Sequence, residues 1–423
     1  MSRTMPIPRR LPPWPILLTT LVLLALPQLW AFPQELSFWR SYAIASGWVA
    51  CSLLLASLLL MVREPGLARR LGGLEAMYCW HHRFGVVAYL LLLSHPLTLA
   101  ADAWSESPAR AWALLAPWQE GWAIWLGWGG LLGLMVGLAG AMAPRLAYRF
   151  WRRLHWLLAL AVALGLAHLL VLGLDAFLLW VPLLALLLLA WRVLGADRGW
   201  SALPYVVEAV QRMGDDGIEA RLRPLTRGLA ARPGQFVLVA FFRGPHFRGC
   251  AEFHPFTLSD VAADGRITLG IKALGDCTRH LQALEPGVAV RVQGPFGRFL
   301  DDEETEPSLW IAGGIGITPF LARLRQGALT VPVRLVYLYR AAEAAYAAEL
   351  DGLAAGHPDL RLQTVACDAQ PPDLVRILPS AAELARHHCY LCGPPGMVQA
   401  AVEVLLARGV HSECIHFERF EFR

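Results

Sequence analysis

The chain has 423 residues, of which 56% are hydrophobic and only 17% are charged, which is unusually apolar for a soluble protein. The formal charge of +4 comes without a basic stripe or interleaved aromatic residues, so the sequence predicts no nucleic-acid partner. Charged residues are sparse up to about position 195 and dense beyond it. We therefore expect a membrane region followed by a region that folds in water.

Six apolar runs in the first region are each about long enough to cross a bilayer as a helix. They lie at 14–32, 38–62, 78–101, 121–142, 153–173 and 175–194. The first run follows a basic start, as a signal peptide would. No small-residue cleavage site follows it, so we interpret it as a helix. The sequence thus predicts a six-helix α transmembrane bundle, and we assign residues 1–198 to it.

Arginine clusters occur at alternate ends of these runs, within 3–10, 63–70, 145–153 and 192–198. The intervening loops carry few basic residues. The positive-inside rule then places both termini and the whole second region in the cytoplasm. We expect a multi-pass protein of the inner (cytoplasmic) membrane, with the lipid bilayer as its first partner.

Four histidines lie in two of these runs. His81 and His95 are 14 residues apart, and His155 and His168 are 13 apart, so each pair spans roughly 20 Å along a helix. Fourteen residues return within about 40° of the starting face, whereas His82, at 13, would be about 140° away from the face of His95. We therefore select His81. The 13-residue spacing of the second pair requires an over-wound or bulged turn, or a different side-chain reach.

Two side-by-side helices with this pattern offer one imidazole pair at each of two depths. We interpret the pairs as axial ligands of two b-type haems, with His81 and His155 on the inner side and His95 and His168 on the outer side. Two axial imidazoles leave no open iron position, which favours electron transfer. Zinc would lack its third and fourth ligands. For any single histidine, a hydrogen bond to a neighbouring carbonyl is the simpler interpretation.

The second region changes to short strands after a polar bridge at 195–204. Strands at 205–209, 217–223, 236–241, 266–271 and 289–293 predict an antiparallel barrel. After Pro307, strands at 309–312, 333–338, 360–364 and 389–391 alternate with helical stretches, which is typical of a parallel α/β sheet. We assign the barrel to residues 199–305 and the α/β domain to residues 306–423.

Five motifs occur in this region in a fixed order. They are HPFTLSD at 254–260, IKALGDCT at 271–278, GPFG at 294–297, AGGIGITPF at 312–320 and CGPPGM at 392–397. In these motifs the second region resembles ferredoxin–NADP reductase-type flavoproteins. The first region resembles the ferric reductase-like transmembrane domain. Together they resemble bacterial NADPH oxidases and ferric reductases over nearly the whole chain.

The resemblance implies an FAD-binding barrel and a nucleotide-binding α/β domain. For FAD it implies an isoalloxazine segment and a pyrophosphate turn, formed by His254, Pro255, Phe256, Thr257, Lys272, Gly275, Asp276 and Thr278. The family usually carries an aromatic residue where Cys277 stands. For the nicotinamide nucleotide it implies a helix start and a second turn, formed by Gly313, Gly314, Gly316, Thr318, Pro319, Cys392, Gly393 and Pro394. Backbone amides at such a helix start can approach phosphates.

Three further residues receive individual roles. Cys392 is expected near the nicotinamide for hydride transfer, although a buried small hydrophobe is the simpler interpretation of a lone cysteine. Phe422, in the terminal FERFEFR, is expected to cover the flavin, or it could merely close the core. Arg340 directly follows an apolar strand that ends without an acidic residue, which favours NADPH, with NADH possible.

The cysteines indicate neither a zinc site nor a set of disulfides. Cys389 and Cys392 form a CxxC without a second pair at zinc spacing, and we interpret it as coincidence. The other cysteines lie in expected spans or in the expected cytoplasmic region, so no disulfide framework is implied.

The expected function is electron transfer from cytoplasmic NADPH through FAD and the two haems to an acceptor outside. Oxygen, reduced to superoxide, is the first candidate acceptor. A ferric chelate, or a periplasmic or membrane partner fed by a relay, are the alternatives. Arg40, near the outer end of the second span, could attract an anion or bind a haem propionate, or it could simply reach the interface. No EF-hand or other regulatory segment occurs, so we expect no obligatory calcium or cytosolic activator.

Overall fold

The computed structural model describes residues 14–15, 18, 21–22, 26, 32–116, 118, 121–143, 148–172, 180–300, 306–341, 344–367, 372–384 and 387–418. The described chain forms two compact units. The helical unit contains the described residues up to 63 together with 76–198. The flavin–nucleotide unit contains residues 64–75, with the short helix α3 (Pro65–Arg70), and the chain from 199 onward.

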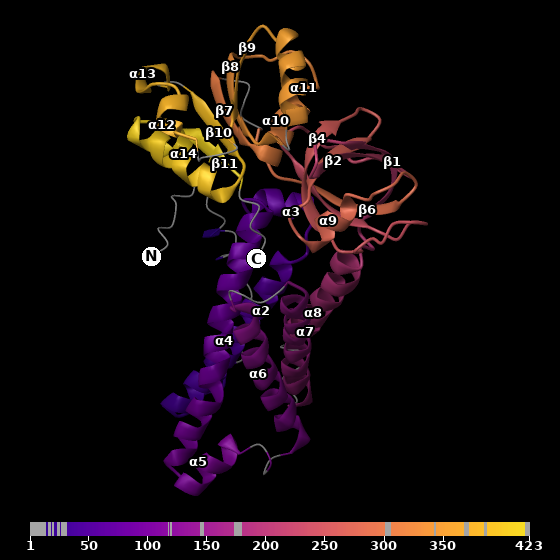
Figure 1. The fold of residues 1–423 in the computed structure, drawn as a ribbon. Helices are drawn as coiled ribbons and strands as arrows, with labels where there is room; N and C mark the ends of the chain where they lie inside the picture. Colours follow the sequence, from indigo (N-terminus) through magenta and orange to yellow (C-terminus); the bar gives the residue numbers. More distant parts are fainter. Residues whose placement is uncertain are drawn as a thin grey trace. The chain divides into compact units, whose positions relative to one another are not determined.

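Long apolar helices make up the helical unit (Figure 1). They are α2 (Phe38–Leu60), α4 (Leu74–Trp104), α6 (Trp122–Ala141), α7 (Tyr148–Val171) and α8 (Trp180–Trp191). The short helix α5 (Pro108–Leu115) follows α4, and a π-helical turn, η2 (Arg192–Asp197), continues α8. Helices α2 and α8 pack together, and α6 packs on α7.

Four helices in the described part of the chain are long and apolar enough to cross a membrane. They are Phe38–Leu60, Leu74–Trp104, Trp122–Gly140 and Arg153–Val171. The expected first span, 14–32, lies mostly outside the described residues. In the expected sixth span, 175–194, the described α-helix has only 12 residues. The described residues thus contain four candidate membrane helices, and the predicted count of six is not confirmed.

Glycines allow α6 to lie close against α7. A Cβ on Gly130 would lie 3.0 Å from the carbonyl oxygen of Ala161, and one on Gly133 would lie 2.9 Å from the Ala161 Cβ. Such short distances leave no room for a side chain. Small residues at a helix interface let two backbones approach, which is the main source of association between helices in lipid.

The flavin–nucleotide unit begins with a closed antiparallel barrel, as predicted. Its strands are β1 (Leu203–Arg212), β2 (Gly217–Pro224), β3 (Phe236–Phe241), β4 (His254–Val261), β5 (Ile267–Lys272) and β6 (Ala289–Phe296), in the order β1-β2-β5-β4-β3-β6. The five expected strands are confirmed. The HPFT motif, expected as an extended run after a strand, is itself the start of β4, with Thr257 opposite Phe236 of β3. A short helix, α9 (Asp276–Leu281), follows β5.

A five-stranded parallel sheet with helices follows the barrel, confirming the expected α/β domain (Figure 1). Its strands are β7 (Ser308–Gly313), β8 (Val333–Tyr339), β9 (Leu360–Ala366), β10 (His388–Cys392) and β11 (Ile415–Phe417), in the order β11-β10-β7-β8-β9. The edge strand β11 was not predicted. Its helices include α10 (Thr318–Leu324), α11 (Ala344–Ala355) and α14 (Pro395–Ala407). The strand order reverses between β7 and β10, where α/β sheets usually bind ligands.

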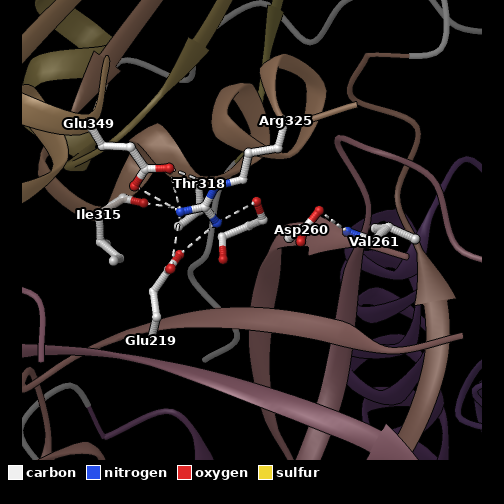
Figure 2. Close-up of polar contacts among 8 residues, drawn as sticks. Glu219, Asp260, Val261, Ile315, Thr318, Arg325 and Glu349 are labelled. Atoms are coloured by element: carbon white, nitrogen blue, oxygen red, sulfur yellow. Dashed lines mark hydrogen bonds and ion pairs between the residues drawn. The ribbon is translucent and has the colours of Figure 1, made fainter. Parts of the chain in front are cut away.

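An arginine joins the barrel to the sheet. Figure 2 shows Arg325, at the end of α10, between Glu219 of β2 and Glu349 of α11. Its guanidinium donates to Glu219 at 3.0 and 3.1 Å and to Glu349 at 2.8 Å. A further bond of 3.0 Å reaches the carbonyl of Ser259 in β4. One buried cation thereby links three separate elements.

Candidate electron-transfer site

The two expected outer histidines are held in the same way by two different helices. His95 of α4 bonds through Nδ1 to the Ala43 carbonyl of α2, at 2.8 Å. His168 of α7 bonds through Nδ1 to the Ala123 carbonyl of α6, at 2.7 Å. The two histidines also lie close enough to interact electrostatically. The two histidine-bearing helices, α4 and α7, are therefore each supported at this level by a backing helix, α2 or α6.

The two expected inner histidines face each other. The ring centroids of His81 and His155 are 6.2 Å apart, with 65° between the ring planes. Nδ1 of His81 contacts the Ser57 hydroxyl at 2.7 Å and the Ser57 carbonyl at 3.2 Å. His155 stacks on Trp151, with 4.9 Å between centroids. Its Nδ1 is buried and has no hydrogen-bond partner among the described residues.

These hydrogen bonds determine which ring nitrogens are available. A carbonyl oxygen can only accept, so His81, His95 and His168 carry their proton on Nδ1. The lone pair of each Nε2 is then free to bind a metal, as in protein sites where a ligating histidine donates its other N–H to a carbonyl. Two metal–imidazole bonds of about 2 Å each, with the ring radii added, give a centroid separation near that of the inner pair. The separation of the His81 and His155 rings therefore fits one metal ion that both imidazoles would hold.

The spacing problem in α7 has a simple solution. The helix is a regular α-helix from Tyr148 to Val171, so no over-wound or bulged turn compensates for the 13-residue spacing. Instead, His155 and His168 reach different neighbours: His155 lies by Trp151 and His81, and His168 lies against α6. In α4, the neighbouring His82 is exposed.

Two arginines and one carboxylate lie near the inner pair. Arg192 and Arg63 both form ion pairs with Asp197, the second at 3.8 Å. Arg63 also donates to the Tyr78 hydroxyl at 3.1 Å. Arg192 interacts electrostatically with His81 and His155. Only 17% of the Arg192 side chain and 14% of the Arg63 side chain is exposed, so the local charge is positive and largely shielded from water.

Arg40 has a partner that the sequence did not indicate. Its guanidinium lies 3.6 Å from the carboxylate of Asp102, near the end of α4. The Ser37 hydroxyl also bonds to Asp102 and accepts from the backbone of Arg40, capping α2. The Arg40 side chain is still 56% exposed. The guanidinium is thus anchored on one side and open to solvent on another.

The structure brings the two glycine-rich motifs of the nucleotide domain together. A Cβ on Gly316 would lie 2.3 Å from the Cys392 carbonyl oxygen, and one on Gly313 would lie 3.0 Å from Pro394. Gly393 adopts a φ of +158°, and a Cβ on it would lie 3.0 Å from the N and Cα atoms of Gly313. Only glycines allow this approach of the two turns at the carboxyl ends of β7 and β10.

Cys392 is fully buried at this edge, and burial raises the pKa of its thiol well above the ordinary value. The nearby Glu418 carboxylate acts in the same direction. Glu418 also lies against Gly297 of the GPFG motif, a neighbour that the sequence analysis did not identify. Arg340 is exposed at the carboxyl end of β8. Phe422 lies outside the described residues.

The expected nucleotide residues at the helix start differ in exposure. Pro319 stands in the first turn of α10, as expected, and Gly314 begins a 3₁₀ turn. Thr318 is buried, and its hydroxyl donates to the Ile315 carbonyl at 3.0 Å. Its methyl group lies against Gly270 of the barrel. Thr318 therefore packs where barrel and sheet meet, and its expected contact with the nucleotide stays a prediction.

The expected FAD residues lie on β4 and at the end of β5. Phe256 and Thr257 are buried, whereas His254 and Pro255 are half-buried. The Lys272 ammonium lies 3.5 Å from Asp216. Thr278 closes its turn by accepting from the amides of Leu274 and Gly275, at 2.9 and 2.8 Å.

Asp276 is exposed and pairs with Arg279. The amide of Gly275, which was expected to face a pyrophosphate, is thus already bonded to Thr278, as is the neighbouring amide of Leu274.

The barrel contains a disulfide that the sequence analysis did not predict. Cys250 and Cys277 form a disulfide, with 6.0 Å between their Cα atoms. The two residues are 27 positions apart, and the barrel brings the segment before β4 next to the start of α9. His254 lies beside the same two sulfur atoms. Composition and cysteine spacing alone could not show this contact.

Three family profiles match successive parts of the chain. A ferric reductase-like transmembrane component matches residues 46–166, an FAD-binding domain matches residues 204–299, and an oxidoreductase NAD-binding domain matches residues 310–403. The order agrees with that of the helical unit, the barrel and the parallel sheet.

Curated relatives match the second region. An NADPH oxidoreductase of Mycobacterium tuberculosis is 32% identical over 202 residues, covering 45% of this chain and 52% of that protein. The ferredoxin–NAD(P)(+) reductase component of a naphthalene 1,2-dioxygenase system of Pseudomonas putida is 29% identical over 229 residues, covering 51% of this chain and 67% of that protein. The chain thus spans about half to two thirds of the length of these relatives.

Among solved structures, a flavohemoglobin from Malassezia yamatoensis matches with a TM-score of 0.47 at 18% identity, covering 98% of this chain and 100% of that chain. The FAD/NAD-binding domain of a nitric oxide dioxygenase from Vibrio cholerae matches with a TM-score of 0.45 at 24% identity, covering 51% of this chain and 97% of that chain.

The domain matches and the observed fold agree on both halves of the molecule. The chain therefore combines, in this order, a ferric reductase-like transmembrane domain, an FAD-binding domain that forms the barrel, and an oxidoreductase NAD-binding domain that forms the parallel sheet.

Proposed function

We propose that the protein moves electrons across a membrane, from NADPH on the cytoplasmic side to an acceptor on the other side. The path begins in the flavin–nucleotide unit, continues to the inner pair, His81 and His155, and ends at the outer pair, His95 and His168. The proposal places both termini and the flavin–nucleotide unit in the cytoplasm. Oxygen, reduced to superoxide, is the proposed acceptor.

The observation that carries the proposal is the matched arrangement of the four histidines. Two ligand helices, α4 and α7, offer one imidazole each at two levels, and the inner rings face each other at 6.2 Å. Three of the four Nδ1 atoms are held by backbone carbonyls. Buried histidines without a common role would have no reason to lie in pairs at two depths, or for three of them to carry the proton on Nδ1.

The protein residues position the cofactors and keep water away from them. The chemistry that the bound groups supply is hydride acceptance at the flavin and one-electron transfer at each haem iron. The interleaved turns at Gly316 and Cys392 present backbone to the nicotinamide nucleotide, and β4 presents Thr257 to the flavin. Cys392 keeps its proton because burial raises the pKa of its thiol, so we assign it a contact role and no role as a base.

The positive cluster near the inner pair has a role in this scheme. Arg63 and Arg192 share a single carboxylate, Asp197, so one guanidinium charge is not balanced within the cluster. A haem carries two propionates, and arginine binds carboxylates through two parallel hydrogen bonds. We assign Arg192 and Arg63 to the propionates of the inner haem. On the outer side, the open face of Arg40 is assigned to an anionic acceptor or to a propionate.

A ferric-chelate reductase is the second candidate, favoured by the ferric reductase-like description of the matching transmembrane profile. The two candidates share the same electron path and differ only in the acceptor. A relay to a membrane or periplasmic partner is a third outcome.

Anaerobic absorption spectroscopy tests the path first. Purified protein loaded with haem and FAD receives NADPH, and the expected result is the reduced spectrum of bis-histidine haem. Oxygen is then added with a superoxide reporter that superoxide dismutase suppresses. Superoxide on reoxidation supports the oxidase. Reduction of a ferric chelate without superoxide would select the reductase. Slow reoxidation of the haems by oxygen and by the ferric chelate alike would select the relay. A protein that binds no haem would overturn the proposal.

A further inference from the structure

The two backing helices repeat the same short sequence. Helix α2 carries Ala-Ile-Ala-Ser-Gly-Trp at 43–48, and helix α6 carries Ala-Ile-Trp-Leu-Gly-Trp at 123–128. Four of the six positions are identical. These segments lie about 80 residues apart in the chain, and each one faces an outer histidine of its neighbouring helix. We call this sequence the Ala-Gly segment.

The alanine of each segment accepts a hydrogen bond from an imidazole. The Ala43 carbonyl accepts a hydrogen bond from Nδ1 of His95 at 2.8 Å, and the Ala123 carbonyl accepts one from Nδ1 of His168 at 2.7 Å. A carbonyl oxygen can accept more than one hydrogen bond, and the Ala43 carbonyl also accepts the Ser46 hydroxyl at 3.0 Å. The glycine stands four residues after the alanine, on the same face of the helix.

The glycine of each segment leaves the space that the ring occupies. A Cβ on Gly127 would lie 3.0 to 3.1 Å from Cε1, Nδ1 and Nε2 of His168. A Cβ on Gly47 would lie 3.3 Å from Nδ1 and 3.6 Å from Cε1 of His95. Both rings therefore lie directly against the backbone of the backing helix. Any larger residue at either position would push the imidazole away from the carbonyl that holds it.

We propose that the Ala-Gly segment positions the outer histidine pair, with Gly47 and Gly127 as its positioning residues. The alanine carbonyl fixes the tautomer of the ring, and the glycine fixes the distance of the ring from the backing helix. Together they determine where Nε2 points. The inference rests on the proposed function, because it concerns ligands of the outer haem. It adds two residues that touch neither the iron nor the acceptor.

The inner pair provides an internal reference. His81 is held by Ser57, and His155 stacks on Trp151. Neither contact involves an Ala-Gly segment. A change in Gly47 or Gly127 should therefore alter the outer haem and leave the inner haem unchanged, whereas a general loss of helix packing would alter both.

The test compares single glycine substitutions in the full-length protein loaded with haem and FAD. Gly127→Ala is the strongest variant, because the added methyl meets three ring atoms. Gly129→Ala, on the same helix, is its matched control: its added Cβ would lie 3.6 Å from Leu164, an ordinary contact. Gly47→Ala is paired with Gly85→Ala on α4, whose added Cβ meets nothing within 4 Å.

The measurements are the electron paramagnetic resonance spectrum of each ferric haem, its midpoint potential and the haem content. A His168→Leu variant identifies the outer signal. We expect Gly127→Ala to shift the outer signal and its potential, or to lose the outer haem, with the inner signal retained. Gly47→Ala should produce a smaller shift in the same signal. Both control variants should match the wild type.

Two results would overturn the inference. In the first, the outer signal and potential of Gly127→Ala equal those of Gly129→Ala. In the second, Gly127→Ala weakens both signals equally, which would show a general packing role. A wild-type protein without haem would already overturn the proposed function at the first measurement, so the two failures are distinguishable.

Discussion

The helical unit and the flavin–nucleotide unit satisfy their buried polar groups in different ways. In the helical unit, neutral side chains bond to backbone carbonyls: Ser46 donates to Ala43 at 3.0 Å, and Ser94 donates to Leu91 at 2.7 Å. In the flavin–nucleotide unit, Arg325 binds two carboxylates (Figure 2). A charge in hydrocarbon is costly, whereas a neutral hydroxyl or imidazole needs only one acceptor. The backbone of a helix supplies such acceptors at every turn.

The helical unit also contains charged groups: Arg40 pairs with Asp102, and Arg63 and Arg192 form a cluster with Asp197 near the inner pair. Charged groups retained in a membrane helix bundle usually mark a functional site. Under the proposed function, neutral backbone contacts would position the haem ligands, and the cluster of Arg63, Arg192 and Asp197 would tune the charge around the inner pair. The following predictions test this division of roles, from the largest effect to the smallest.

Replacing an outer ligand should have the largest effect. His168→Leu removes the imidazole that bonds to the Ala123 carbonyl, and we expect loss of the outer haem and of electron delivery to the external acceptor. Reduction of a soluble dye by NADPH should persist, because the flavin–nucleotide unit is unchanged. Haem content and the two activities measure this. Equal loss of both activities would contradict the separation of the units.

Arg325→Ala should destabilise the flavin–nucleotide unit. It leaves Glu219 buried without its cation, and breaking a partly buried ion pair of this kind costs about 2–4 kcal/mol. Thermal unfolding followed by flavin fluorescence measures the loss. Arg334→Ala is the control, since its ion pair with Glu383 is much more exposed and its removal should change little. Equal effects of the two substitutions would contradict this prediction.

Arg192→Gln should lower the midpoint potential of the inner haem. A positive charge within about 10 Å of a partly buried group contributes about 1–2 kcal/mol, so the shift should be on the order of tens of millivolts. The outer haem should change less. Redox titration of both haems checks this. A larger shift at the outer haem would show that the cluster acts elsewhere.

Ser57→Ala should have a small effect. It removes the hydroxyl that lies 2.7 Å from Nδ1 of His81, but the Ser57 carbonyl at 3.2 Å remains. The loss is about 0.5–1.5 kcal/mol, as for one ordinary hydrogen bond. The inner haem should stay bound, with a slightly altered spectrum. Complete loss of the inner haem would show that the hydroxyl, and not the carbonyl, holds His81.

The pH dependence of flavin reduction should show no titration of Cys392. Burial raises the pKa of this thiol well above the ordinary value, so the neutral form persists from about pH 6 to about pH 9. Stopped-flow reduction by NADPH should give the same pH profile for the wild type and for Cys392→Ala, whatever their absolute rates. A step near pH 8.5 that is present only in the wild type would contradict the neutral thiol.

Much of the fold follows from local sequence patterns. The strands expected at 236–241 and 333–338 correspond closely to β3 and β8, because an apolar run bounded by turn residues is a local signal. The edge strand β11 has only three residues, too few to produce such a pattern. The HPFT motif is expected as an extended run after a strand, whereas its pairing with β3 makes it the start of β4.

The site could be predicted only in part. His81 was selected over His82 by helical periodicity alone, and the structure places His81 beside His155 and leaves His82 exposed. The Cys250–Cys277 disulfide and the approach of Glu418 to Cys392 were not predicted. Both contacts join segments that are far apart in the chain, and the sequence does not show that these segments lie close together in the fold.

Local sequence patterns predict the apolar helices, the four histidines at two depths and the ordered flavin and nucleotide motifs. These features depend on residue type and on spacing within one element. No local pattern predicts that Ala43 and Ala123 hold the outer imidazoles, that Gly47 and Gly127 make room for them, or that Arg325 joins the barrel to the sheet. Those contacts depend on how separate elements pack, and an identical local sequence could serve a different neighbour in another fold.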